Sequence, residues 1–305
     1  MPPTRDATRF APVFVLASAR SYSSIVSAML GQHPHLFGFP ELKLFAYPTV
    51  GELDASLPRE ARERGFSHRA PGLVRALAEL EYGGQNEPAL AAAGAWLTER
   101  SGWPGEQVLD LLMTRVSPRV AVEKSPEHVV APHALCRLAE AYPRARYVHL
   151  TRHPVSTIRS MHEHLLRTLP GYRDRDFTRY CITTWLRGHQ RIAAFTRRLP
   201  PERRLRLRAE GVLNEPAPHL RAVAMWLGIS AGEHALDAMR HPERSPFAGF
   251  APAASGVSGG NDPAFLRDPQ PHAVGLPRDL GPPEGWPSDP ALWAKVRRAG
   301  RELGY

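Results

Sequence analysis

Cysteine and lysine are scarce in this sequence, and long apolar runs are absent. The 305 residues include only two cysteines, Cys136 and Cys181, and these form no C-x-x-C motif. A disulfide scaffold, a cysteine zinc site and an iron–sulfur cluster are therefore excluded. No apolar run approaches the roughly 18 residues that a membrane-spanning helix requires, so we expect neither a transmembrane helix nor a membrane partner.

Positive charge is plentiful and is carried almost entirely by arginine. The chain has 39 Lys and Arg residues against 30 Asp and Glu, and only Lys43, Lys124 and Lys295 are lysines. The net charge of +9 is typical of a GC-rich genome, and also of a protein that binds nucleotides, phosphate, sulfate or an acidic partner. The basic residues form no block and do not alternate with aromatics, so we do not expect nucleic-acid binding.

The first 18 residues resemble a short signal peptide. Arg5 and Arg9 precede the apolar stretch FAPVFVLASA. That stretch is short for a signal peptide, Asp6 interrupts the basic region, and cleavage would remove a segment that fits a buried strand. We therefore expect a cytoplasmic protein.

Strand and helix patterns alternate along the chain, which predicts an α/β fold with a mostly parallel sheet flanked by helices. Short apolar runs, typical of strands buried on both faces, are separated by helical patterns. We expect strands at 13–17, 120–122, 147–150 and 205–207, and helices at 23–31, 71–81, 88–100, 105–115, 129–141, 154–167, 176–199, 215–227 and 289–303.

The chain is interpreted as one domain, residues 1–305, that carries two additions. Residues 52–115 are rich in Ala and Leu and would form a helical insertion. Residues 242–290 are dense in Pro, Gly and Ser and show no periodicity. A loop of this length in a compact protein commonly covers a binding site, so we expect this segment to cover a cofactor or acceptor.

The segment ARSYSS, residues 19–24, joins the first expected strand to the first expected helix. Such a turn presents free backbone N–H groups and the positive end of the helix dipole, which together bind anions. Ser21, Ser23 and Ser24 add hydroxyl groups, and Arg20 adds a guanidinium that can bind an anion through two hydrogen bonds. The turn lacks the glycines and the lysine of an ordinary ATPase or kinase loop. A simple βα turn capped by serines is the alternative.

The segment YVHLTRHPVSTIRSM places Arg152 directly after an expected strand and Ser160 eight residues further on. Between them, Pro154 suits the first position of a helix. Ligands of open α/β sheets bind at the carboxyl ends of the strands, so Arg152 and Ser160 could bind a second phosphate. The alternative is a surface arginine and a helical serine with no binding role.

The segment VAVEKSPEH again places a polar turn after an expected strand. Lys124 is one of only three lysines, which indicates that a compact ammonium is required there rather than a guanidinium. His128 adds a second titratable group close by in the sequence. A surface turn without function is the alternative.

The segment LFGFPELKLF places Glu41 after Pro40 among apolar residues. An apolar environment makes a carboxylate a stronger base, which suits proton abstraction. Alternatively, Glu41 simply begins a helix after the proline.

Taken together, FVLASARSYSSIVSAMLGQHP, FPELKLF, VEKSPEH and VHLTRHPVSTIRS resemble the sulfotransferases that use 3′-phosphoadenosine 5′-phosphosulfate (PAPS). The resemblance is greatest to bacterial members related to the protein-tyrosine sulfotransferases. It runs in order from about residue 12 to about residue 268, and HPERSPFAGF and GGNDPAFL within it resemble a cofactor-covering loop. A three-layer P-loop-like α/β domain is implied.

The resemblance also implies the reaction and its residues. The enzyme would move a sulfonate from PAPS to a hydroxyl of a small molecule or carrier-bound metabolite, without a metal, and release 3′-phosphoadenosine 5′-phosphate (PAP). The implied residues are Arg20, Ser21, Tyr22, Ser23 and Ser24 around the phosphosulfate, Arg152 and Ser160 at the 3′-phosphate, Glu41 or His128 as base, Lys124 near the sulfonate, and Asn261 in the covering loop.

Tyr22 departs from the family pattern, which usually reads R-S-G-[ST]-T and has glycine at this place. If that glycine requires a positive φ, tyrosine would be strained there. We therefore expect the loop to follow an altered path.

Other functions are less well supported by the sequence. A non-catalytic nucleotide-binding protein would result if Tyr22 blocked the sulfonate pocket, and a phosphotransferase would need an unusual loop. A serine hydrolase is suggested by G-x-S-x-G around Ser258, with Asp262 and His272 after it, but the motif lacks the strand and helix that it requires. His162-Glu163-His164 resembles a metal site, but it lacks the H-E-x-x-H spacing.

Overall fold

The computed structural model describes nearly all of the chain. Among the helices of that part, none is both long and apolar enough to cross a membrane. The described residues are 6–63, 65–131, 133–168, 177–257, 259–277, 279–287 and 289–305.

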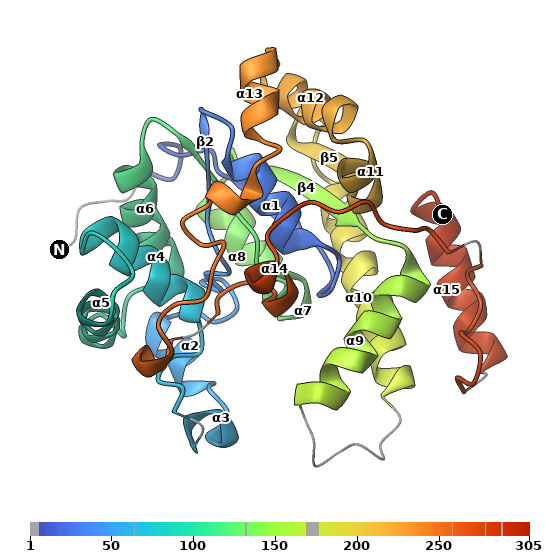
Figure 1. Cartoon of the computed structure of the whole chain (residues 1–305), viewed down its shortest axis with the longest axis horizontal. Coiled ribbons are helices and arrows are strands. Elements are labelled where there is room, and N and C mark those ends of the chain that lie inside the picture. The colour runs from blue at the N-terminus through green and yellow to red at the C-terminus, as the bar shows by residue number, and fades with distance from the viewer. Residues whose placement is uncertain are drawn as a thin grey trace.

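Within these residues, five parallel strands form a sheet in the order β2-β3-β1-β4-β5 (Figure 1). β1 lies at the centre, where Val13 pairs with Val122 of β3 on one side and with Arg146 of β4 on the other. The expected parallel α/β sheet is therefore confirmed. Its strands are β1 (Val13–Leu16), β2 (Leu36–Gly38), β3 (Val120–Glu123), β4 (Arg146–Thr151) and β5 (Arg204–Arg208).

Helices cover both faces of the sheet, which gives the three-layer arrangement. Side chains alternate along a strand, so Val13 and Val15 of β1 enter a core with α1, α11 and α12, whereas Phe14 and Leu16 enter a core with α6, α8 and α10. β1 is thus buried on both faces, as its continuous apolar run predicts. These helices are α1 (Ser23–Gly31), α6 (Gly105–Val116), α8 (Ala134–Ala141), α10 (Thr178–Thr196), α11 (Ala209–Asn214) and α12 (Pro216–Leu227), and α13 (Glu233–Ala238) follows α12.

The expected helical insertion lies on one side of the molecule (Figure 1). α4 packs against both α5 and α6 there. Asn86 caps α5 by accepting a hydrogen bond from the backbone of Ala89, and a proline follows in the first turn, a common helix start. The helices before α6 are α2 (Val50–Ala55), α3 (Arg59–Glu63), α4 (Pro71–Glu81) and α5 (Glu87–Glu99).

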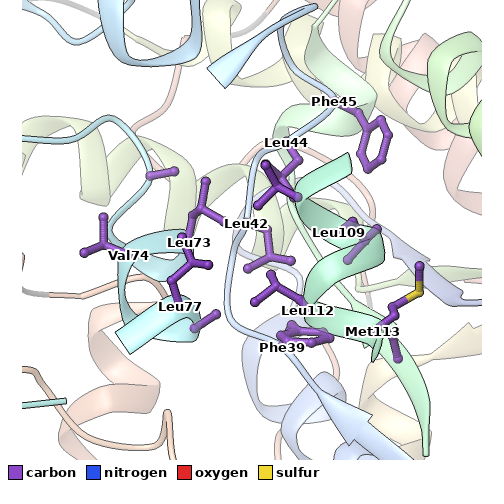
Figure 2. Packing of buried hydrophobic residues seen from close by; sticks show 14 of the residues in the cluster. Phe39, Leu42, Leu44, Phe45, Leu73, Val74, Leu77, Leu109, Leu112 and Met113 are labelled. Carbon is purple, nitrogen blue, oxygen red and sulfur yellow. The ribbon is translucent and has the colours of Figure 1, made fainter. Parts of the chain in front are cut away.

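Residues 39–45 pass between α4 and α6, and this packing orients two charged side chains. Figure 2 shows Phe39, Leu42, Leu44 and Phe45 among leucines of α4 and α6, all of them buried. Burial of a large apolar side chain contributes about 1.5–3 kcal/mol, so the segment is held firmly. Glu41 and Lys43, which lie between these apolar residues, line a cavity on the other side.

One sequence prediction of secondary structure was wrong, and one strand was missed. The helix expected at 129–141 is broken into α7 (Glu127–Val130) and α8, because His133 adopts a left-handed conformation (φ 62) that no α-helix accommodates. The sequence also has proline at position 132, which lies outside the described residues. The short strand β2 was not expected at all, since three residues between His-Pro and Phe-Pro carry no strand pattern of their own.

The 242–290 segment runs across the molecule from α13 to the last helix (Figure 1). It contains little regular structure, as expected: 3₁₀ turns at Pro242–Arg244 and Ala253–Ser255, and the short helix α14 (Pro263–Arg267). The last helix, α15 (Pro290–Glu302), packs in a third apolar cluster with α9 (Pro154–Thr168) and α10. The expected helix at 176–199 is confirmed between Thr178 and Thr196, where α10 ends; residue 176 lies outside the described residues.

Two buried histidines make the folded state sensitive to acid. Burial lowers the pKa of His189 to about 3 and that of His128 to about 4. A histidine in an unfolded chain has a pKa of about 6.5, so below that pH the unfolded state binds more protons than the folded state. The stability that these two groups provide is complete above pH 6.5 and is lost as the pH falls toward 4 and 3.

Replacing His189 with glutamine is expected to flatten this pH dependence. Glutamine keeps a polar partner for Nε2 of His149, which lies 2.9 Å from Nδ1 of His189, but it cannot be protonated. Between pH 7 and pH 5 the wild-type protein should lose about 2 kcal/mol more unfolding free energy than the variant. Urea unfolding at both pH values measures the difference, and equal losses in the two proteins would contradict this origin of the pH dependence.

Candidate active site

The candidate site forms where the carboxyl ends of four neighbouring strands meet. Because all strands are parallel, the residues that follow them reach the same edge of the sheet, where ligands bind in open α/β folds. Arg20 follows β1, Glu41 follows β2, Lys124 follows β3 and Arg152 follows β4. The structure thus brings together four residues that lie up to 132 positions apart in the chain.

The turn after β1 exposes the N-terminus of α1. Arg20 and Tyr22 both adopt the left-handed conformation, with φ 66 and φ 59. No side chain caps the first turn of α1, and its first helical backbone bond is donated by Val26 to Tyr22. Within the described residues, the N–H groups of Ser23 and Ser24 therefore stay available for an anion.

Tyr22 occupies the left-handed conformation for which glycine is favoured, at a cost of about 1–3 kcal/mol. The strain that the sequence predicts for a tyrosine with a positive φ is therefore present at Tyr22. The Arg152 guanidinium lies 3.9 Å from the centre of the Tyr22 ring, a cation–π contact that holds the arginine in place. Arg152 also donates a hydrogen bond of 2.6 Å to the backbone oxygen of Arg20, so the strained turn and Arg152 position each other.

Arg20 extends toward α9 and toward the long loop. Its Nε donates to Oγ of Ser160 (3.2 Å), and its guanidinium forms an ion pair with Asp262. Burial raises the pKa of Asp262, but Arg20, the backbone N–H of Ala264 and Lys124 together outweigh it and leave that pKa below its ordinary value. Arg152 and Ser160 thus lie at the same place as Arg20, in agreement with their eight-residue spacing.

Lys124 lies beneath this edge and is almost completely buried. Its ammonium donates to Oγ of Ser24 (2.8 Å), to Oε1 of Glu41 (2.9 Å) and to Oδ1 of Asn261 (3.1 Å). These three acceptors use all three hydrogens of an ammonium group. A guanidinium could not converge on them in the same way, which accounts for lysine in an arginine-rich chain.

Glu41 does not lie in the apolar environment that its sequence neighbours suggested. The neighbours point into the core, while the carboxylate faces two ammonium groups: Lys124, and Lys43 at 3.8 Å. Lys43 in turn forms a 2.6 Å ion pair with Glu127. Burial lowers the pKa of Lys43, but Glu127 and Glu41 together outweigh it and raise that pKa above its ordinary value.

His128 and Ser21 do not reach the site. His128 is buried against Phe14 and Phe45, with Nδ1 3.3 Å from Oε2 of Glu123, and it lines neither cavity described below. Burial raises the pKa of Glu123 to about 8, despite hydrogen bonds from a serine hydroxyl and a backbone N–H. The Ser21 side chain is fully buried and also lines neither cavity.

Residues 259–263, the cover segment, close over the turn after β1. The backbone N–H of Asp262 donates to Oγ of Ser24 (3.0 Å), and Asn261 accepts from Lys124. Part of the loop-rich 242–290 stretch therefore lies directly on the predicted anion site.

The helical insertion anchors the cover segment. Gly260 has φ 90, and a Cβ atom on it would lie 2.5 Å from Cα of Gly72 in α4, so glycine is required where the two backbones cross. The N–H of Glu41 donates to the oxygen of Gly260 (2.7 Å), and the buried Arg75 of α4 donates to the oxygen of Gly259. The insertion thus fixes the height of the cover segment above the sheet.

Two cavities open at the site and share part of their walls. The first, of about 400 Å³, is lined by Arg152, Ser160 and Tyr22 and by residues 264–274 of the long loop. The second, of about 640 Å³, is lined by Glu41 and Asn261 among others. The residues common to both walls are Arg20, Ser24 and Asp262.

The alternative sites find no support in the geometry. Ser258 of the G-x-S-x-G motif lies outside the described residues, Asp262 is paired with Arg20, and His272 is bound to Asp268 (2.8 Å). His162 lies 4.8 Å from the ring of Trp286. Among the described residues, no group of three His, Cys, Asp or Glu side chains is arranged to hold a metal ion.

Several residues at the site were missed by sequence reasoning. Lys43 and Arg69 line the second cavity, Arg75 supports the cover segment, and Arg267 lines the first cavity. Lys43 carried a usable signal, because it is one of only three lysines and lies two residues from Glu41. The arginines carried none, since the chain is rich in arginine throughout.

Comparisons with known proteins agree with this geometry. The model of the family described as "Sulfotransferase family" matches residues 12–233. A solved sulfotransferase domain from the curacin biosynthetic pathway superposes with a TM-score of 0.77 and 24% identity, covering 98% of this chain and 99% of that one. The sulfotransferase domain of the olefin synthase of Synechococcus PCC 7002 superposes with a TM-score of 0.71 and 23% identity, covering 100% of this chain and 98% of that one.

A search of curated proteins finds no match. At under 25% identity the two solved domains show the fold, whereas the family model covers well over half of the chain. The chain therefore belongs to the sulfotransferase family and is a sulfotransferase enzyme.

Proposed function

We propose that this enzyme transfers a sulfonate group from PAPS to a hydroxyl group of a small molecule or a carrier-bound metabolite. The observation that carries the proposal is the pair of cavities that meet at Arg20 and Ser24. One cavity has groups that bind anions, and the other has the carboxylate of Glu41. A donor and an acceptor can therefore reach the same point, one through each cavity.

The first cavity suits the donor. Sulfotransferases use PAPS, which carries negative charge at both its 3′ and 5′ positions. The uncapped end of α1 and Arg20 would hold the phosphosulfate, and Arg152 and Ser160 would hold the 3′-phosphate. Nε of Arg152 is buried and has no hydrogen-bond partner among the described residues, which supports a missing anion.

The second cavity suits the acceptor. Glu41 would accept the proton of the acceptor hydroxyl as the oxygen attacks sulfur. A new S–O bond would form to the acceptor, the S–O bond to the phosphate would break, and PAP would leave with the electrons of that bond. Arg20, which lines both cavities, would stabilise the charge on the transferred group and on the leaving phosphate.

Lys124 would act through its partners. It lines neither cavity, but it holds Ser24, Glu41 and Asn261, all of which line the second. We therefore assign Lys124 as a positioning residue that fixes the direction of the Glu41 carboxylate.

Calorimetric titration with PAP, and with ADP as the control ligand that lacks the 3′-phosphate, tests the donor assignment. The wild-type enzyme should bind PAP more tightly than ADP, because Arg152 and Ser160 would bind the 3′-phosphate, which ADP lacks. Equal affinity for the two ligands, or no binding of PAP, would reject the proposed function.

Replacing Arg152 with alanine is expected to weaken PAP binding about 10–100-fold, the usual loss for a hydrogen-bonded charged group. ADP binding should weaken by a smaller factor, because Arg152 also supports the turn after β1, so the variant should lose its preference for PAP. Arg159→Ala, on the exposed side of α9, is the matched control. A variant at position 152 that keeps the preference for PAP would contradict the assignment.

A further inference from the structure

The second cavity combines an apolar wall with a charged one. Its apolar part is formed by side chains from the insertion, α7, α9 and α10. The charged part lies around Glu41 and the cover segment. The apolar lining residues on these elements are Phe66, Pro71, Val130, Met161, Leu165 and Tyr180.

Almost every charge around this cavity has a partner of opposite sign. Arg20 is paired with Asp262, Lys43 with Glu127 at 2.6 Å, and Lys124 with Glu41 at 2.9 Å. These pairs leave the polar wall nearly neutral.

Arg69 is the exception. Its side chain lines the cavity and is half-buried, yet its guanidinium makes no hydrogen bond or ion pair within the described part of the chain. Burial and the Lys43–Glu127 contact are the largest influences on the pKa values of Lys43 and Glu127. Arg69 makes a smaller contribution that lowers both pKa values, so its charge acts inside the cavity. An arginine that loses hydration without gaining a partner is unfavourable unless a ligand supplies one.

The backbone at Arg69 is fixed before any ligand binds. Asp54 of α2 accepts a hydrogen bond from the N–H of Arg69 (3.0 Å) and another from Nδ1 of the neighbouring His68 (2.8 Å). Only the rotamers of the Arg69 side chain can then change when a ligand binds. The entropy lost on binding is therefore small, which favours affinity for the ligand.

We infer that Arg69 binds an anionic group, a carboxylate or a phosphate, on the acceptor, so that the acceptor is a hydroxylated amphiphile with an acidic end. The acidic end lies at Arg69, the hydrocarbon part lies along the apolar wall, and the hydroxyl lies at Glu41. This inference rests on the proposed function, because it assigns the second cavity to the acceptor.

Calorimetric titration with 3-hydroxydecanoate and with its methyl ester tests the inference, each with and without saturating PAP. The two probes have the same hydrocarbon chain and hydroxyl group, and the ester replaces the anionic charge with a neutral methyl ester. The wild-type enzyme should bind the acid at least about 10-fold more tightly than the ester, as a charge-assisted hydrogen bond provides. Arg69→Gln should bind the two probes equally, whereas Arg59→Gln, an exposed arginine of α3, should keep the preference. A further titration with decyl phosphate distinguishes a carboxylate from a phosphate. Whichever of 3-hydroxydecanoate and decyl phosphate binds more tightly identifies the anionic group that Arg69 prefers.

Equal affinity of the wild-type enzyme for acid and ester would overturn the inference, as would a preference that survives in Arg69→Gln. Failure of both probes to bind would also overturn it. The PAP titration reports separately on the proposed function: PAP binding without an acid preference rejects the role of Arg69 alone, whereas an acid preference without PAP binding rejects the donor assignment alone.

Discussion

Replacing Glu41 with glutamine is expected to lower turnover about 10²–10⁴-fold, the usual contribution of a general base. Glutamine has the same shape, and its carbonyl oxygen can still accept the hydrogen bond from Lys124, so the site should stay assembled. It cannot take up the acceptor's proton. Steady-state turnover with PAPS and a panel of phenols and hydroxy acids measures the loss, while PAP affinity should be nearly unchanged because Glu41 lines only the acceptor cavity.

The matched control for this variant is Glu163→Gln on the exposed side of α9, which should retain full turnover. If Glu41→Gln also retained full turnover, Glu41 would not be the base. Glu127 would then be tested next, because its carboxylate lines the same cavity and pairs with Lys43. His128 would remain a poor candidate, since it is buried behind Glu123.

Replacing Arg20 with glutamine is expected to lower turnover about 10²–10³-fold, as does the loss of one preorganised group that stabilises developing charge. Arg20 lies on the wall common to both cavities, and its guanidinium is held between Ser160 and Asp262. This two-sided contact orients the charge before the substrates bind. Lysine should restore only a small part of the loss, because an ammonium group cannot make the same two contacts from one position.

Arg187→Gln, an exposed change on α10, is the control for this pair of variants. Arg20→Gln should also weaken PAP binding, but by less than it lowers turnover, since the charge on the leaving phosphate increases as the S–O bond breaks. A variant that loses PAP affinity and turnover by the same factor would show instead that Arg20 only binds the donor.

The sequence predicted the parts of the site that depend on neighbouring residues. The apolar run of β1, the serines after it and the apolar stripe of α1 are all local, so the turn between this strand and this helix could be recognised before the fold was known. The same holds for Arg152 at the end of β4. Parallel pairing then carries these local turns to one edge of the sheet, which is why separate motifs combine into one site.

Local patterns failed where distant contacts decide the structure. β2 is a strand because Leu36–Gly38 pairs with β3, 84 positions later in the register, and three residues have no strand tendency that could predict this. Glu41 has apolar neighbours in sequence, but packing between α4 and α6 turns those neighbours inward and leaves the carboxylate facing two lysines. The environment of a side chain depends on the whole fold, and its flanking residues do not specify it.

The α/β class, the strand–turn–helix unit that carries Arg20 and the family of this protein could thus be recognised from the sequence. Contacts between distant segments place Tyr22 in a left-handed conformation against Arg152 and let Lys124 hold Ser24 from 100 positions away. They also leave the Arg69 guanidinium without a hydrogen-bond or ion-pair partner among the described residues. The two groups of features depend on interactions that act over different distances along the chain. Hydrophobic periodicity and turn chemistry act within a few residues, whereas ion pairing and burial act between segments that are brought together only when the sheet and its covering loop have formed.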